Sequence, residues 1–169
     1  RGKTQDVMLR LSPSIDPHTH EKTTTGILDS KFGFSIETGD AESAIKRALV
    51  ASNLDLVGIH FHLGSPIFEL EPYSIAIDTV LTFLSQFKQA GLDLREFSPG
   101  GGFAIGYLHN QLPPPIASYA EVITKALKTR ASDLSFGEPM LTIEPGRSIV
   151  GRAGVAVYTV GGIKNIPTV

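Results

Sequence analysis

The sequence predicts an α/β protein built around a parallel sheet, and two observations carry that prediction. Short apolar runs typical of buried strands alternate along the chain with longer segments whose apolar residues recur at helical spacing. Strands that alternate with helices in this way are joined by right-handed crossovers, which place successive strands side by side and parallel. The order of the elements fits a doubly wound sheet and a barrel equally well, so both alternatives remain open at this point.

Composition limits the class of protein. The chain has 169 residues, of which 41% are hydrophobic and 19% charged, as in globular proteins with a real core. The net charge of -2 and the lack of a Lys/Arg cluster argue against nucleic acid or an anionic membrane as a partner. No apolar run is long enough to span a bilayer, and the first residues lack the apolar core of a signal peptide. We therefore expect a soluble cytoplasmic protein.

The first third of the chain predicts a strand, a loop and a helix. The strand is an apolar run over residues 7–11, closed by a Ser-Pro pair. The following polar loop, residues 14–30, contains His18-Thr19-His20-Glu21, whose composition suits metal ligands although a solvated loop is the favoured interpretation. Asp40 is then expected to be the N-cap of a helix that ends near residue 49.

The second strand, residues 54–62, contains the sequence that organises the chain, Gly58-Ile59-His60-Phe61-His62-Leu63-Gly64-Ser65. His60 and His62 point the same way, because side chains two apart on a strand share a face. They could be two satisfied core histidines, or, less well supported, metal ligands, since no third ligand is marked nearby and the chain has no cysteine. A third interpretation places an imidazole against a planar cofactor, with Gly64 and Ser65 facing an anion beyond the strand end.

The second helix is predicted by its two ends. Pro72 lies near its first turn and Gly91 lies just past its last one, as is usual for helices. Its apolar stripe must cover neighbouring strands, and consists of Tyr73, Ile77, Val80, Leu81, Leu84 and Phe87.

The rest of the chain predicts two further strands that end in unusual turns. One strand, near residues 94–97, runs into Ser98-Pro99-Gly100-Gly101-Gly102. A third helix follows, marked by a capping-box pattern of Ser118 and Glu121. The next strand, residues 140–143, ends in Glu144-Pro145-Gly146-Arg147, and an ordinary strand is expected over residues 154–160.

These two turns carry the strongest chemical signals. Three consecutive glycines suggest a close approach of the backbone to a ligand, with the amides of Gly100, Gly101 and Gly102 facing an anion; a flexible turn is an equal alternative. In the second turn Pro145 and Gly146 fix the backbone while Glu144 and Arg147 face different parts of one ligand. An ion pair at a loop is the alternative, but an exposed pair contributes only about 0 to 1 kcal/mol to stability.

All of the unusual residues lie where a strand gives way to a loop. They are the segments 62–65, 100–102 and 144–147, each after a different predicted strand. In a parallel barrel the carboxyl ends of the strands open onto one face, where functional sites are built. We therefore expect the three segments to converge on one site.

In this order and spacing, the segments 58–65, 100–103 and 144–147 resemble the fold-type III pyridoxal-phosphate decarboxylases. Within that group the motifs Arg10-Leu11-x-Pro13, His18-Thr19-His20-Glu21, Lys31-Phe32-Gly33 and His60-x-His62-x-Gly64-Ser65 are most similar to those of the diaminopimelate decarboxylases. The resemblance implies an α/β fold, the (β/α)8 barrel, and a lyase of lysine biosynthesis that uses pyridoxal 5'-phosphate to convert meso-2,6-diaminopimelate to L-lysine.

The resemblance also implies roles for individual residues. His62 would stack on the pyridine ring, and Glu144 would meet the ring nitrogen and keep it protonated. Arg147 would also reach the substrate, where a guanidinium suits a carboxylate. The phosphate or its surroundings would be held by Ser65, Gly100, Gly101, Gly102, Pro145, Gly146 and Arg147. His60 is matched by the family without an assigned role, and no metal is implied.

Two departures from the family indicate that this chain is a segment. The family's cofactor-binding lysine lies on the first barrel strand, where this chain has no counterpart, and the chain lacks the downstream catalytic cysteine. We expect residues 1–153 to form the C-terminal half of the barrel and 154–169 to begin a β domain. The segment alone should be inactive, and the full-length protein should be a homodimer. A decarboxylase of ornithine, arginine or carboxynorspermidine, or a non-catalytic pyridoxal-phosphate-binding protein, are the alternatives.

Overall fold

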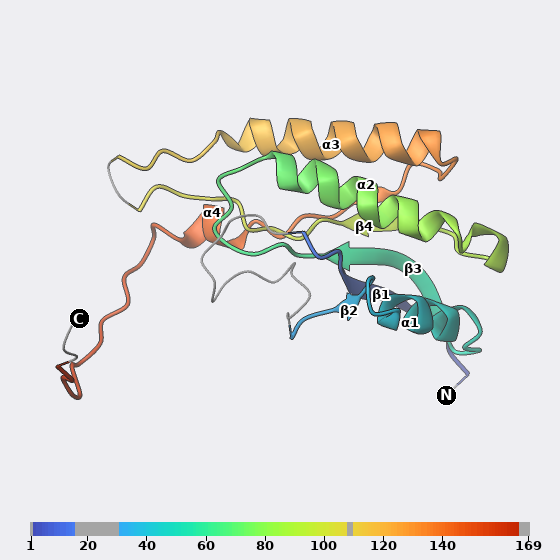
Figure 1. The fold of residues 1–169 in the computed structure, drawn as a ribbon, viewed down its shortest axis with the longest axis horizontal. Helices are drawn as coiled ribbons and strands as arrows, with labels where there is room; N and C mark the ends of the chain where they lie inside the picture. The colour runs from blue at the N-terminus through green and yellow to red at the C-terminus, as the bar shows by residue number, and fades with distance from the viewer. Residues whose placement is uncertain (1, 16–30, 108–109, 166–169) are drawn as a thin grey trace.

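The fold is centred on a parallel sheet (Figure 1). The computed structural model describes residues 2–15, 31–107 and 110–165. Its five strands lie in the order β2-β1-β3-β4-β5, and every neighbouring pair is parallel. The strands are β1 (Gln5–Ser12), β2 (Phe34–Ser35), β3 (Leu54–Phe61), β4 (Glu96–Ser98) and β5 (Met140–Leu141). The four predicted strands before residue 144 are therefore present with shifted ends, whereas β2 is too short for a sequence pattern to predict.

Three helices pack against this sheet through their apolar stripes. They are α1 (Asp40–Leu49), α2 (Glu71–Ser85) and α3 (Ile116–Asp133), and their buried residues form one cluster with those of the strands. A single 3-10 turn, η1 (Lys88–Ala90), follows α2, and a short helix, α4 (Gly146–Val150), follows β5. The helix predicted to run up to Gly91 thus ends earlier, and Gly91 instead caps η1 in the left-handed region, with a φ of 96°.

The alternation along β3 separates two faces of the sheet. Ile59 and Phe61 are fully buried in the helix-covered core, whereas His60 between them is only half-buried. The residues in register with His60 are Arg10 on β1 and Ser98 on β4. Since registered side chains share a face, one face of the sheet is apolar and covered by helices, and the other carries Arg10, His60 and Ser98.

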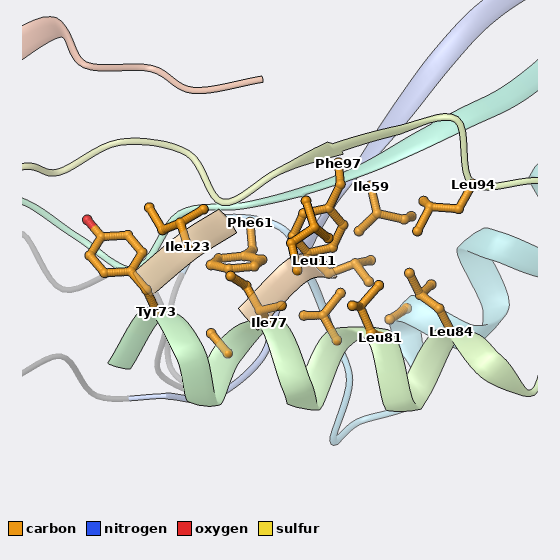
Figure 2. Packing of buried hydrophobic residues seen from close by; sticks show 14 of the residues in the cluster. Leu11, Ile59, Phe61, Tyr73, Ile77, Leu81, Leu84, Leu94, Phe97 and Ile123 are labelled. Carbon is orange, nitrogen blue, oxygen red and sulfur yellow. The ribbon is translucent and has the colours of Figure 1, made fainter. Parts of the chain in front are cut away.

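The core lies between α2 and the strands (Figure 2). Leu81 and Leu84 point from the helix toward Ile59 and Phe97 on the sheet, and all four side chains are fully buried. Phe61 and Phe97 meet edge to face, with ring centroids 5.9 Å apart. Burying each such side chain stabilises the fold by about 1.5 to 3 kcal/mol before entropy is counted, so this layer holds the strand ends in place.

The progression of the strands distinguishes a barrel from a doubly wound sheet. From β1 through β3 and β4 to β5, each new strand is added on the same side of the previous one. A doubly wound sheet reverses this direction and places helices on both faces. Here the three helices share one core on one face. The arrangement is that of an arc of a barrel whose inner face carries the polar residues.

Three local predictions were wrong. Helix α1 is capped by Gly39 in the left-handed region, and Asp40 is its first helical residue; its carboxylate accepts a hydrogen bond from the Thr38 hydroxyl at 2.7 Å. The capping box is absent, because α3 begins at Ile116 after Pro115, and Ser118 therefore lies inside the helix. The ring of Pro115 fixes its φ, and its ψ of 145° is not helical. The helix therefore begins at the next residue, Ile116.

The third wrong prediction is the strand over residues 154–160. This segment forms no strand within the described part of the chain, and its side chains are exposed. An apolar run becomes a strand only beside a partner strand, and the described residues offer none there. The predicted loop cluster at 18–21 lies outside the described residues. None of the described helices has both the length and the apolar character that a membrane span requires.

Candidate functional site

The three segments expected to converge do meet at the carboxyl ends of β3, β4 and β5. Gly101 and Glu144 form a parallel bridge, and the Glu144 amide donates to the Gly100 carbonyl at 2.9 Å. Arg147 Nε donates to Ser65 Oγ at 2.7 Å across 82 residues of sequence. We call Gly100–Gly102 the glycine turn and Glu144–Arg147 the acid-arginine segment.

The glycine turn is buried and can be formed only by glycine. Gly100 and Gly102 have φ values of 74° and 92°, in the left-handed region that other residues avoid. Gly101 needs no special φ, but a Cβ there would lie 1.8 Å from the Glu144 carbonyl oxygen. The turn is thus closely packed against the acid-arginine segment, which is a stronger reason for glycine than flexibility.

Hydrogen bonds fix the peptide groups of this turn. The Gly101 amide donates to His62 Nδ1 at 3.2 Å, and the Gly102 carbonyl accepts from the Ile67 amide at 2.8 Å. The Gly101 carbonyl accepts from the Tyr73 hydroxyl at 2.6 Å. The interpretation of the glycines as a flexible turn is therefore wrong, because the backbone is held on several sides.

Two histidines face the carboxylate of Glu144. His60 Nε2 lies 3.4 Å from Glu144 Oε2, and His62 Nδ1 lies 4.0 Å from the same oxygen. Burial lowers the pKa of both imidazoles, and for His62 the nearby charge of Arg10 lowers its pKa further. Both rings are therefore neutral at neutral pH. His62 accepts a hydrogen bond through Nδ1, so its proton is on Nε2.

Arg147 is held by two hydroxyl groups. In addition to its bond to Ser65, it donates through a second nitrogen to the Tyr107 hydroxyl, and its guanidinium lies 5.7 Å from the centre of that ring. Arg147 belongs to α4, which begins at Gly146 directly after Pro145. The short helix directs the arginine back toward the turn after β3, although the sequence pattern there indicated only a turn.

Sequence reasoning missed three residues near the site. Tyr73 was assigned only to the apolar stripe of α2, and the signal for its role was a hydroxyl within a stripe that faces the core. Tyr107 follows the glycine turn closely along the chain, in a loop without a pattern. Arg10 was named only as part of a motif similar to one of the family, without a role of its own. Its register with His60 places its charge near Glu144.

The residues brought together suit a planar, protonatable ring that carries an anionic group. His62 offers a neutral flat ring, and Glu144, with more than half of its side chain exposed, offers an acceptor for a ring N–H. Ser65 and Arg147 offer donors for an anion beside the glycine turn. Among the described residues, no group of three or more potential metal ligands is found.

Comparison with known proteins agrees with this chemistry. The family model described as "Pyridoxal-dependent decarboxylase, pyridoxal binding domain" matches residues 2–151. A diaminopimelate decarboxylase of Halalkalibacterium halodurans is 37% identical over 98% of this chain and 38% of its own length. One from Staphylococcus aureus is 42% identical over 98% of this chain and 39% of its own length. The chain therefore spans about two fifths of the length of these relatives.

A solved structure gives the same result for the fold. The diaminopimelate decarboxylase of Helicobacter pylori, in complex with L-lysine, is 32% identical with a TM-score of 0.75, covering 88% of this chain and 35% of that one. The resemblance and the barrel fold that it implied are thereby confirmed, together with pyridoxal phosphate as the cofactor of the family. The convergence of the strand ends is then the expected product of barrel geometry. This chain belongs to the pyridoxal-dependent decarboxylases, within their pyridoxal-binding domain.

Proposed function

We propose that this chain is part of an enzyme that decarboxylates meso-2,6-diaminopimelate to L-lysine with pyridoxal phosphate. The observation that carries the proposal is the meeting of His62, Glu144 and Arg147 at three strand ends beside the glycine turn. The substrate assignment is supported by the relatives named diaminopimelate decarboxylase, which match nearly the whole chain. The activity belongs to the complete protein, of which residues 1–153 would form half of the barrel and 154–169 the start of a β domain.

The residues of this chain would bind and orient the cofactor. The neutral imidazole of His62 would lie against the pyridine ring, and the Glu144 carboxylate would accept the ring N–H and hold its proton there. When bound, pyridoxal phosphate supplies an electron-accepting ring that takes up the electron pair of the carboxylate bond that breaks. A charged Glu144 matters because only a protonated ring nitrogen makes that uptake favourable.

The anionic groups would meet the donors on the other side of the site. Ser65 and the Gly102 amide would hold the phosphate, because the Gly100 and Gly101 amides already donate to Ser98 Oγ and His62 Nδ1. Gly100, Gly101, Pro145 and Gly146 would shape the adjacent backbone. Arg147 would bind a substrate carboxylate, because its planar fork suits two oxygens. In the structure Ser65 and Tyr107 accept hydrogen bonds from two of its nitrogens, and these bonds would orient the guanidinium in the site.

The rest of the catalytic set would come from outside this chain. The chain contains no cysteine, and the lysine that binds the cofactor in this family has no counterpart on the strands of the described residues. We therefore propose that these residues lie elsewhere in a full-length cytoplasmic homodimer. The polar face of the sheet, with the half-buried Arg10 and His60, would face the interior of the completed barrel.

The test is carbon dioxide release by the complete protein with pyridoxal phosphate, offered meso-diaminopimelate, L-ornithine and L-arginine in parallel. Release from diaminopimelate alone, with L-lysine as product, is the expected result. Release from another amino acid would retain the cofactor site and reject the lysine-forming reaction. No release from any substrate, with the cofactor bound, would favour a binding protein over an enzyme.

A further inference from the structure

Tyr73 carries a hydroxyl group that packing alone does not explain. Its side chain is fully buried at the start of α2, among the rings of Phe103 and Tyr119, each with its centroid 6.0 Å away. Figure 2 shows its hydroxyl oxygen at the end of the ring, pointing away from the helix. A phenylalanine would fill the same space, and burying a hydroxyl costs free energy unless it is bonded.

The hydroxyl is bonded to the glycine turn. It donates to the Gly101 carbonyl at 2.6 Å, a short and fully buried hydrogen bond. Burial raises the pKa of Tyr73 above its ordinary value, so the group keeps its proton and acts as the donor. The tyrosine therefore links the first turn of α2 to the middle residue of the glycine turn.

This bond sets the direction of the next amide. The peptide between Gly101 and Gly102 is trans, because the single cis bond of the described chain is Ser65-Pro66. In a trans peptide the C=O and N–H groups point to opposite sides. When Tyr73 draws the Gly101 carbonyl toward the helix layer, the Gly102 N–H is directed away from it. His62 and Ile67 hold the peptides before and after this one, but the Gly101–Gly102 peptide lies between two glycines, so without the tyrosine it could rotate at low cost.

We propose that Tyr73 is a positioning residue for the phosphate site: its hydroxyl fixes the Gly101–Gly102 peptide so that the Gly102 amide faces the phosphate. This rests on the proposed function, in which the glycine turn holds the phosphate of pyridoxal phosphate. This role differs from general core packing because the Tyr73 hydroxyl would affect only the phosphate end of the cofactor. Removal of the hydroxyl should therefore weaken the binding of the phosphate and leave the binding of the ring unchanged.

The experiment compares two ligands that differ by the phosphate. The complete protein is freed of cofactor, and dissociation constants for pyridoxal phosphate and for pyridoxal are measured by absorbance and fluorescence titration. Tyr73→Phe should weaken pyridoxal phosphate about tenfold, the effect of weakening one hydrogen bond from the Gly102 amide to the charged phosphate, and change pyridoxal less than about twofold. The preference for the phosphorylated ligand falls by about the same tenfold factor.

Tyr119→Phe is the matched control. Tyr119 is also fully buried, and its hydroxyl donates to the Ile67 carbonyl at 2.5 Å and accepts from the Ala104 amide at 3.3 Å. It is the same chemical change in the same core, made at a hydroxyl that does not bond the glycine turn. This variant should lower the urea midpoint while it keeps the ratio of the two dissociation constants.

Each outcome decides the proposal. An equal loss for both ligands in Tyr73→Phe, or no loss, would overturn it, as would the same change of ratio in Tyr119→Phe. If Tyr73→Phe does not fold, Tyr73→Met can replace it, because methionine also lacks the hydroxyl and adapts to irregular space. The same change is then expected in the ratio of the dissociation constants for pyridoxal and pyridoxal phosphate. A wild-type protein that binds both ligands equally would instead refute the phosphate site of the proposed function.

Discussion

The glycine turn and the acid-arginine segment lie side by side, but the protein holds them in different ways. All three residues of the turn are buried, and their peptide groups bond to Tyr73, His62, Ile67 and Glu144. Glu144 and Gly146 are exposed, and the segment is attached through its main chain and through the contacts of Arg147. One half of the site is thus part of the core, and the other half lies on its surface.

The difference predicts how each half responds to substitution. Changes in the turn alter packing against the backbone, so they should affect folding and ligand binding together. In the acid-arginine segment the Glu144 side chain is exposed, so changing it should affect chemistry while the fold remains. The Glu144 side chain, more than half exposed, can be replaced without leaving a buried cavity.

The largest expected difference between the two halves comes from adding one methyl group to a glycine in each. Gly101→Ala would place a Cβ 1.8 Å from the Glu144 carbonyl, and backbone cannot move aside as a flexible side chain can. We expect a loss of roughly 3 kcal/mol or more in the free energy of unfolding. Gly146→Ala meets nothing within 4 Å at the start of α4, and should change stability by less than about 1 kcal/mol, in the stabilising direction.

Urea denaturation of the two variants beside the wild type measures both effects. Gly137→Ala, at a third glycine with open space around it, controls for the substitution itself. Equal losses in Gly101→Ala and Gly146→Ala would contradict the division of the site into a buried and an exposed half. A stable Gly146→Ala variant that no longer binds pyridoxal phosphate would show that Gly146 is required by the ligand.

Glu144→Gln should separate chemistry from folding. The amide keeps the shape of the side chain but removes the charge that would hold a proton on the ring nitrogen, so carbon dioxide release should fall about 100-fold. Because the side chain is mostly exposed, unfolding should change by less than about 0.5 kcal/mol. The control is Glu138→Gln, at an exposed glutamate just before β5, the strand that Glu144 follows. This variant should alter neither carbon dioxide release nor the free energy of unfolding. Full activity in Glu144→Gln would remove that residue from the proposed mechanism.

The pH dependence of stability should report on His62, which borders both halves. Burial and Arg10 lower its pKa in the folded state below the ordinary value of 6.5, so the unfolded chain binds protons first as the pH falls. Its contribution is therefore present above pH 6.5 and is lost as the pH falls from there through the folded-state pKa. His62→Gln should reduce the slope of stability against pH in this window. A slope that is unchanged in His62→Gln would assign the titration to other groups.

The buried features of the fold could be predicted from the sequence better than the exposed ones. The strands around Phe61 and Phe97 and the stripe of α2 were predictable because burial imposes apolar periodicity. The cap at Gly39 and the start of α3 after Pro115 were not, since several residues near a helix end can serve as its first one. The strand expected over residues 154–160 failed because pairing depends on a distant partner, which local sequence does not specify.

The site divides in the same manner. The residues that converge were predictable, because the position of His62, Gly101 and Glu144 after strands fixes them at one edge of a parallel sheet. Their supports were not predictable, because Tyr73 and Tyr107 reach the site through tertiary contacts. A tyrosine within an apolar stripe reads as core, and only the structure shows where its hydroxyl points.

The smallest effect should come from Tyr107, which supports Arg147 from the exposed side. Tyr107 is 55% exposed, and Tyr107→Phe removes a hydroxyl but keeps the ring beside the guanidinium. Ser65 still holds Arg147, so KM for diaminopimelate should rise only roughly threefold, with kcat unchanged. Tyr158→Phe, at a tyrosine 86% exposed, is the control and should have no effect. A large fall in kcat for Tyr107→Phe would mean that the exposed half of the site is held as rigidly as the glycine turn, and the contrast between them would then be one of burial alone.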